Sequence, residues 1–342
     1  MTKRAVVVTT LALMLGITGP ACGKNPGEPA DAVRAALRRT ASEPRRFSYT
    51  EVTSERTVAV DGVVEDDYRY KVAVSVDDAA AYDEVARDDA LAVRFAAPEL
   101  IGSVSLASAA PSAAVQDALR TRRWVTDPVG APDLTGAAAL TRPPGEDPVL
   151  DGLTLAAYVS KAIGEAESVR RFNPEAIDYI AREDRFPKPE DGSGVTRFDL
   201  RPPTIPAPGG VRAGGLPGLA HLRRMSVYVK GGVVTNVLED IDVGSRLDRL
   251  LRLVDVKAPP RASRVQRAQL AVAALNRQRA SQGSALIRIR RMSAEFIDVG
   301  RSSTVELPGE TITGSLNVIR NRGRTPKAAT TTTAPSQPQP QP

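Results

Sequence analysis

The chain has 342 residues, of which 42% are hydrophobic, 25% are charged and only 4% are aromatic. This balance is typical of a globular protein with a core of Val, Leu, Ile and Ala, and it excludes a chain that is disordered throughout. The net charge is +6, but 46 basic and 40 acidic residues are mixed along the sequence, so we expect no nucleic-acid partner.

The first 21 residues have the pattern of a secretory signal peptide. Lys3 and Arg4 precede an apolar run over residues 5–17, and small residues follow immediately before Cys22. The apolar run is shorter than the ~20 residues that a membrane-spanning helix needs. We therefore predict a signal peptide over residues 1–21 and an exported protein.

Cys22 is the only cysteine of the chain, and it follows the predicted cleavage site directly. This position resembles the lipobox of bacterial lipoproteins, although Gly19 and Pro20 depart from the usual residues. The resemblance implies acylation of Cys22, residues 22–30 as a lipidated tether, and anchoring at the outer face of the cytoplasmic membrane. An ordinary signal-peptidase site at the same bond is the alternative.

A helix over 31–40 and a long antiparallel hairpin are predicted next. Residues 64–76 alternate apolar and polar side chains, which is typical of a strand with one buried face. The dipeptide Asp61-Gly62 is a strong hairpin signal, so we place a two-residue turn there. With this turn, Phe47 is expected opposite Val76 and Tyr49 opposite Val74.

The apolar face of this hairpin contains our candidate ligand-binding residues. They are Phe47, Tyr49, Tyr68, Tyr70, Val72, Val74 and Val76. Two interpretations remain open. These side chains either fill the core between sheet and helices, or they line a cavity for an apolar ligand.

The remaining elements follow from periodicity and turn residues. Strands are predicted at 80–87, 122–125, 195–200, 225–229 and 233–243 (with Gly231-Gly232 as a turn), near 287–299, and at 304–307 and 312–319. Helices are predicted at 115–119, 153–163, after Asn173, and at 263–282, and a short helix or turn at 88–95. Residues 128–151 are predicted to be a loop, and the Pro, Gln and Thr-rich residues 324–342 a disordered tail.

Chemistry-bearing motifs are few. One histidine, His221, and one cysteine do not suffice for a zinc or iron cluster, so we expect no metal and no cofactor. Runs of carboxylates are the remaining candidates for catalysis; they are Glu65-Asp66-Asp67, Asp88-Asp89, Glu190-Asp191 and Glu239-Asp240. Most such runs are solvated turns, so we expect a protein that is not an enzyme, with a carboxylate-based wall hydrolase as the weaker alternative.

The order of a lipidated cysteine, a short helix and hairpins that contain Phe47-x-Tyr49 and Tyr68-x-Tyr70 resembles a known group. It is similar to the periplasmic lipoprotein-carrier superfamily, and in particular to its lipid-binding lipoproteins in actinobacteria. The resemblance covers about residues 30–256. It implies a half-closed sheet over helices with acyl chains held between them. Residues 259–323 have no counterpart in that family.

These observations lead to one prediction of fold and function. The fold class is α+β, with a curved, mostly antiparallel sheet packed on helices over residues 31–256, and a helix-plus-strands extension over 257–323. The function is a membrane-anchored cell-envelope lipoprotein that binds or transfers a lipid-like ligand. The alternative is a cell-envelope interaction module with a filled core and a tail that reaches into the wall.

Overall fold

The computed structural model describes residues 28–54, 56–66, 69–87, 90–96, 112–127, 155–172, 194–207, 216–241, 243–284 and 286–314. The predicted signal peptide, Cys22, Tyr68, the loop at 128–151, the helix after Asn173 and the tail at 324–342 lie outside these residues.

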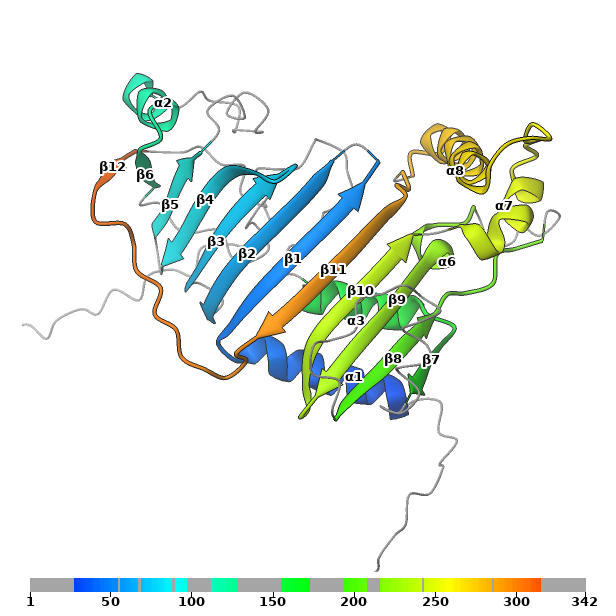
Figure 1. Ribbon diagram of the computed structural model, residues 1–342, viewed down its shortest axis with the longest axis horizontal. Coiled ribbons are helices and arrows are strands. Elements are labelled where there is room, and N and C mark those ends of the chain that lie inside the picture. Colours follow the sequence, from blue (N-terminus) through cyan, green and yellow to red (C-terminus); the bar gives the residue numbers. More distant parts are fainter. Residues whose placement is uncertain are drawn as a thin grey trace, which may run out of the picture.

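One twelve-stranded sheet forms the body of the protein (Figure 1). Across the sheet the strands are β12 (Thr311–Thr313), β6 (Trp124–Asp127), β5 (Ala90–Phe95), β4 (Ala79–Arg87), β3 (Arg69–Val76), β2 (Thr57–Asp66), β1 (Arg45–Thr53), β11 (Arg290–Ile297), β10 (Val233–Ile241), β9 (Arg223–Lys230), β8 (Val195–Arg201) and β7 (Ser168–Phe172). All neighbouring pairs are antiparallel except β12 and β6, which are parallel.

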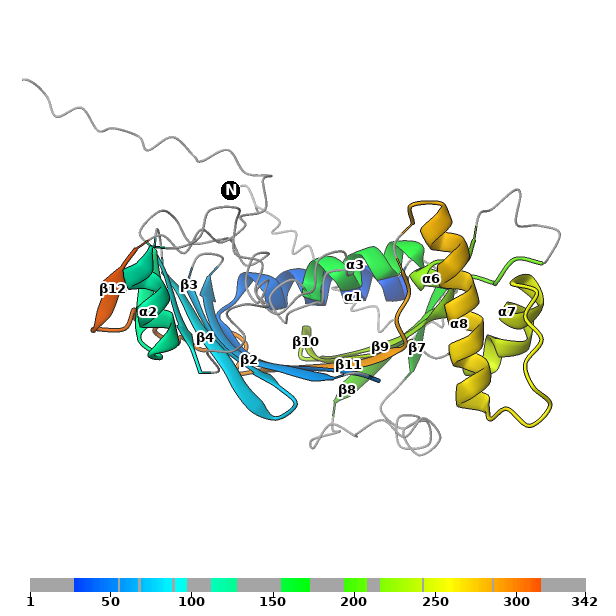
Figure 2. The same cartoon turned by 90° about the horizontal axis from the view of Figure 1, so that it is seen from above.

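The sheet is curved, and helices lie on its concave face and at its ends (Figure 2). Helices α1 (Glu28–Ser42) and α3 (Leu155–Glu165) cover the half that contains β7–β10, whereas α2 (Ala113–Arg120) packs at the opposite end. The short α6 (Leu219–Leu222), a 3₁₀ turn (Gly244–Arg246), α7 (Leu247–Leu253) and α8 (Arg264–Ser281) lie beyond one end of the strands. The predicted α+β class with a curved, mostly antiparallel sheet on helices is confirmed.

Helix α1 is fixed to the sheet by its own polar groups as well as by its buried Val33 and Leu37. The hydroxyl of Thr40 accepts a hydrogen bond from the backbone N–H of Val234 at 2.8 Å, and Arg39 donates to the carbonyl of Gly231. Both partners belong to the β9–β10 hairpin, so the helix is tied to the sheet at that turn.

The predicted turn at Asp61-Gly62 is wrong, because both residues lie inside β2. Phe47 pairs with Gly62 and not with Val76, and Tyr49 pairs with Val60 and not with Val74. A Cβ atom at position 62 would overlap the ring of Phe47. The glycine therefore serves the close approach of a buried aromatic ring, not a change of chain direction.

The predictions for other short segments are mixed. Residues 90–95 form β5 and not a helix or turn, because Leu91, Val93 and Phe95 alternate into the core. Strand β7 was not predicted, and residues 304–307 have no regular structure. The β9–β10 hairpin and α8 are confirmed, and the side chain of Ser263 caps α8 in a capping box with Gln266.

Strand β11 comes from the segment that the sequence analysis treats as an extension. It lies in the middle of the sheet, between β1 and β10. The first and second halves of the chain therefore meet through a strand that is contributed from residues 290–297.

Two hydrophobic clusters stabilise the fold. The larger one joins the concave face to α1, α2 and α3. The smaller one lies between α7, α8 and the adjoining strand ends, with Ile241, Leu250 and Leu275 fully buried. The α7–α8 unit, residues 244–289, thus has a core of its own at one end of the sheet.

Candidate functional site

The concave face of β1–β3 contains the residues that the sequence analysis proposes for ligand binding. All of those that the structure describes point to this face and belong to, or pack against, the larger cluster. They are Phe47, Tyr49, Tyr70, Val72, Val74 and Val76. Tyr68 and the proposed lipidation site Cys22 lie outside the described residues.

Strand register explains why these side chains form one continuous apolar surface. Tyr49 pairs with Val60, Val60 with Val74, and Val74 with Tyr82. Tyr82 in turn pairs with Phe95, and their ring centres are 5.8 Å apart. Directly opposite residues on one face of a sheet contact each other, so an apolar row crosses β1–β5. We call it the apolar row.

The apolar row lies between the two groups of helices. Helix α1 contacts α3, β7, β9 and β10, whereas α2 contacts β5, β6 and β12. The middle of the concave face is thus bordered by helices on both sides (Figure 2).

The two described tyrosines among the candidate residues have their hydroxyl groups paired. Tyr49 donates to Glu51 at 2.9 Å, and Tyr70 donates to Glu84 at 2.6 Å. Burial, followed by the charge of Glu51, raises the pKa of Tyr49 well above its usual value. The Tyr49 hydroxyl therefore stays protonated, and both hydrogen bonds fix their rings against the sheet.

The candidate side chains are in contact with other protein atoms. Phe47, Tyr49, Tyr70, Val72 and Val74 are each at most 2% exposed. A void large enough for water would leave part of their surface accessible. In this structure these side chains are buried, so a ligand can reach the apolar row only if the atoms that cover it move away.

Toward the α7–α8 unit the same concave face changes from apolar to charged. Four adjacent strands each contribute one charged residue near the strand end, and α3 contributes a tyrosine above them. These residues are Glu51 of β1, Arg290 of β11, Glu239 of β10, Arg223 of β9 and Tyr158 of α3. We call them the charged row. The side chains of its four charged members are at most 7% exposed.

Glu239 and Arg290 form the centre of the charged row. Arg290 Nη2 donates to Glu239 Oε1 at 3.2 Å and to the Tyr158 hydroxyl at 3.0 Å, and Tyr158 donates to Glu239 Oε1 at 2.8 Å. Arg290 Nη1 also lies 3.7 Å from Glu51 Oε2. One guanidinium therefore links β11 to β1, to β10 and to α3.

Arg223 extends the charged row to the other side of Glu239. Its Nε lies 3.4 Å from Glu239 Oε2, and its Nη1 donates to Glu165 at 3.1 Å. The guanidinium lies 4.6 Å from the ring centre of Tyr158, within the range of a cation–π contact. Two contacts with α3, through Glu165 and Tyr158, thus hold that helix on the sheet.

The charges in this row balance one another. Burial alone lowers the pKa of Arg290 and of Arg223, but Glu239 and the other neighbours outweigh it and hold both pKa values above the usual range. Burial and the charge of Glu239 raise the pKa of Tyr158. The arginines are therefore charged and Tyr158 is neutral at every physiological pH.

The charged row was not predicted from the sequence, because a carboxylate run such as Glu239-Asp240 is usually solvated. A signal was present in the strand patterns. Glu239 lies in phase with the apolar Val237 and Ile241, and Arg290 lies in phase with Met292 and Ala294. A charge in the apolar phase of a strand indicates a buried ion pair when neighbouring strands carry the opposite charge there.

Neither a membrane-spanning helix nor a metal site is found among the described residues. None of the described helices is both long enough and apolar enough to cross a bilayer. Within the same residues, no group of three or more His, Cys, Asp or Glu side chains could hold a metal ion.

Comparison with known proteins gives one structural neighbour to report. No family model matches the sequence, and no curated protein matches it significantly. The crystal structure of LprF from Mycobacterium bovis aligns with 82% of this chain and 97% of that chain, at 9% identity and a TM-score of 0.29. We draw no functional argument from so low a TM-score, and the resemblance to lipoprotein carriers stays a prediction.

Proposed function

We propose that this protein is a membrane-anchored cell-envelope lipoprotein that binds a lipid-like hydrophobic ligand on the concave face of its sheet, without catalysing a reaction. The observation that carries the proposal is the apolar row across β1–β5, on the concave side of a curved sheet and between two groups of helices. Acyl chains gain ~25 cal/mol for each Å² of apolar surface that they bury there.

Ligand binding requires the closed concave face to open. The apolar row depends on nonspecific packing, which a ligand of similar shape can replace. A ligand cannot replace the contacts of the charged row in this way, because separation of its partners would leave buried charges without compensation. We therefore propose that the face opens over β1–β5 while the charged row keeps α3 fixed on β9–β11.

The filled-core interaction module is the second candidate, and the burial of the candidate residues favours it. A substitution of Val74 by Trp distinguishes the two functions, because Val74 lies within the apolar row. If the row exchanges its packing with a ligand, Val74→Trp keeps the fold and loses binding of envelope lipids. If the row is a permanent core, the variant is destabilised by ~1–3 kcal/mol.

The matched control is Ala73→Trp, one position earlier on the same strand. Ala73 is exposed on the opposite face of the sheet. We expect this variant to bind lipid as the wild type does, with lipid retention measured by mass spectrometry and stability by urea denaturation. Lipid binding that is equal in both variants and the wild type would contradict the proposed site.

The acyl anchor is tested separately at Cys22. Metabolic labelling with an alkyne fatty acid should label the wild-type protein in its native host and leave Cys22→Ser unlabelled. Equal labelling of both would show that Cys22 is not the acylated residue, and no labelling of either would contradict lipidation.

A further inference from the structure

We propose that the α7–α8 unit, residues 244–289, is a second membrane-contact surface that docks on a bilayer containing anionic lipid. This surface differs from the concave face and from the acyl anchor, and its function does not depend on whether the concave face binds a ligand.

The charge of this unit is the first observation. Residues 244–289, which end before β11, contain ten Arg or Lys and only two Asp, and no acidic residue occurs between Asp255 and Glu295. Since the whole chain has a net charge of +6, the rest of the chain is net negative. The positive charge is thus concentrated at one end of the sheet, around α7 and α8 (Figure 1).

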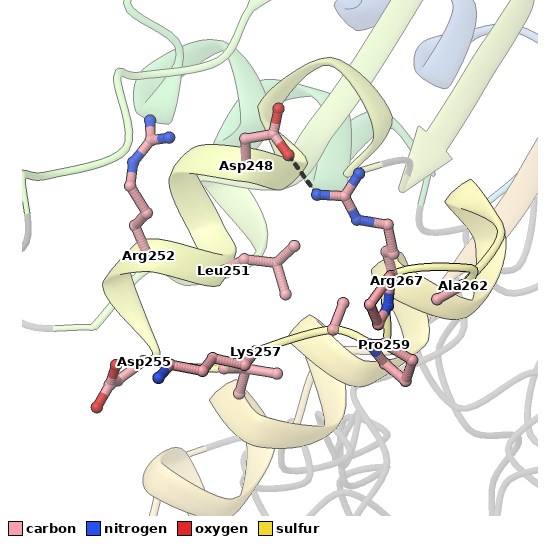
Figure 3. A pocket seen from close by; sticks show the side chains of 11 residues that line it. Asp248, Leu251, Arg252, Asp255, Lys257, Pro259, Ala262 and Arg267 are labelled. Atoms are coloured by element: carbon pink, nitrogen blue, oxygen red, sulfur yellow. Dashed lines mark hydrogen bonds and ion pairs between the residues drawn. The ribbon is translucent and has the colours of Figure 1, made fainter.

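Much of this charge is available to a partner. Arg249, Arg252, Lys257, Arg261 and Arg264 are exposed, and within the described parts of the chain none of them forms an ion pair. Arg267 is different, because it pairs with Asp248 at 2.8 Å across the pocket between α7 and α8 (Figure 3). That pocket, of about 470 Å³, also contains Lys257 and Arg252 in its lining.

Exposed apolar side chains on the same unit are the second observation. Among the described residues, the large hydrophobic side chains that are exposed include Val265, Leu270 and Leu286 of this unit, with Val265 66% exposed. Val265 lines a groove of about 620 Å³ between α8 and the ends of β1 and β11, and Leu270 lines a second one of about 600 Å³ along α8.

A bilayer surface fits both observations. Anionic headgroups attract exposed Arg and Lys, at about 1 kcal/mol for each cation near the surface. Apolar side chains between the cations gain free energy when they enter the interface. A soluble polyanion would satisfy the cations alone and would leave Val265 and Leu270 in water, so the structure favours the bilayer.

The groove beside α8 also adjoins the charged row. Its lining includes Arg290, which binds Glu239 and Tyr158 on the concave face. The groove itself opens on the opposite face of the sheet, because its lining residues Val52, Asp240 and Arg291 alternate along their strands with Glu51, Glu239 and Arg290 of the charged row.

Vesicle sedimentation of the chain from Gly23 onward, which keeps every described element, tests the proposal. We expect binding to vesicles of phosphatidylcholine and phosphatidylglycerol in equal parts, weaker binding in high salt, and little binding to phosphatidylcholine alone. The double variant Arg261→Ala/Arg264→Ala should lower the partition coefficient about 25-fold, because each cation contributes about fivefold.

The matched control is Arg120→Ala/Arg123→Ala, which removes two exposed arginines near α2 at the far end of the sheet. This control should bind as the wild type does. Equal losses in the two double variants would overturn the proposal, because attraction would then depend on net charge and not on this surface. Absence of wild-type binding to the anionic vesicles would overturn it as well.

A second variant distinguishes a bilayer from a soluble polyanion. Val265→Ser/Leu270→Ser keeps every charge, and both positions are exposed, so the fold should persist; circular dichroism checks this. We expect at least about fivefold weaker vesicle binding, since apolar burial is lost. Unchanged vesicle binding, with equal displacement of wild type and variant by soluble polyglutamate, would identify a polyanion site and overturn the bilayer proposal.

Discussion

The apolar row and the charged row lie on the same face of the same sheet, yet they stabilise the protein in different ways. Tyr49 and Glu51 are two residues apart on β1, and one belongs to each row. Apolar packing can be exchanged for contact with another apolar surface at little cost. A buried ion pair cannot, because separation of its partners would leave charges buried without compensation. We infer that one region of the concave face can rearrange while the other is fixed.

The largest effect is expected where the charged row is broken. Glu239→Gln removes the carboxylate that Arg223 and Arg290 share, so it should lower the free energy of unfolding by about 3–5 kcal/mol. Urea denaturation followed by circular dichroism measures this change.

The control for this variant is Asp248→Asn, which breaks the exposed pair between Asp248 and Arg267. An exposed pair contributes at most about 1 kcal/mol. If both substitutions lowered the free energy of unfolding by the same amount, the charged row would not be the fixed region that we describe.

A smaller effect is expected in the apolar row. Gly62→Ala places a Cβ atom against the ring of Phe47 and a methyl group of Val72. The free energy of unfolding should therefore fall by about 1–3 kcal/mol. Phe47→Leu in the same chain should recover part of this loss, because it removes the ring that the new methyl group meets.

Gly164→Ala is the matched control, since a Cβ atom there would meet no atom within 4 Å. In helix α3 this substitution should be neutral or should stabilise by up to about 1 kcal/mol. If Gly62→Ala lowered the free energy of unfolding as much as Glu239→Gln does, the two rows would not differ in the way we describe.

The smallest effect concerns the protonation of Tyr158. Tyrosine in an unfolded chain ionises near pH 10, whereas the pKa of Tyr158 is raised in the folded protein. Above about pH 10 the unfolded state loses a proton that the folded state keeps, so stability should fall as the pH rises.

Tyr158→Phe should cost about 1 kcal/mol at neutral pH and make the alkaline loss of stability shallower. Chemical denaturation at a series of pH values from about 8 to 11 tests this. A slope that is identical in the variant and the wild type would show that Tyr158 is not buried against Glu239.

Much of the fold could be predicted from local patterns, and the errors have physical causes. The β9–β10 hairpin was predicted correctly because Gly231 and Gly232 both have positive φ, which their sequence context indicates. Asp61-Gly62 has the same turn signature, but its glycine instead provides space for Phe47 from another strand. That requirement depends on the register between β1 and β2, which a local pattern does not contain.

The apolar part of the candidate site could be predicted from the sequence, and the charged part could not. Alternation along β3 correctly placed Tyr70, Val72 and Val74 on one buried face, because that property is local to the strand. The charged row depends on Arg223 and Arg290, which are far apart in sequence and become near neighbours only when β11 enters between β1 and β10. Sequence spacing alone could not bring them together.

Native mass spectrometry of the chain from Gly23 onward, purified without detergent from a related host, tests the central claim most directly. We predict a bound species of lipid mass that is released when the protein is denatured and is absent from Val74→Trp but present in Ala73→Trp. A bare polypeptide mass, unchanged after incubation with extracted envelope lipids, would contradict the claim and favour the filled-core interaction module.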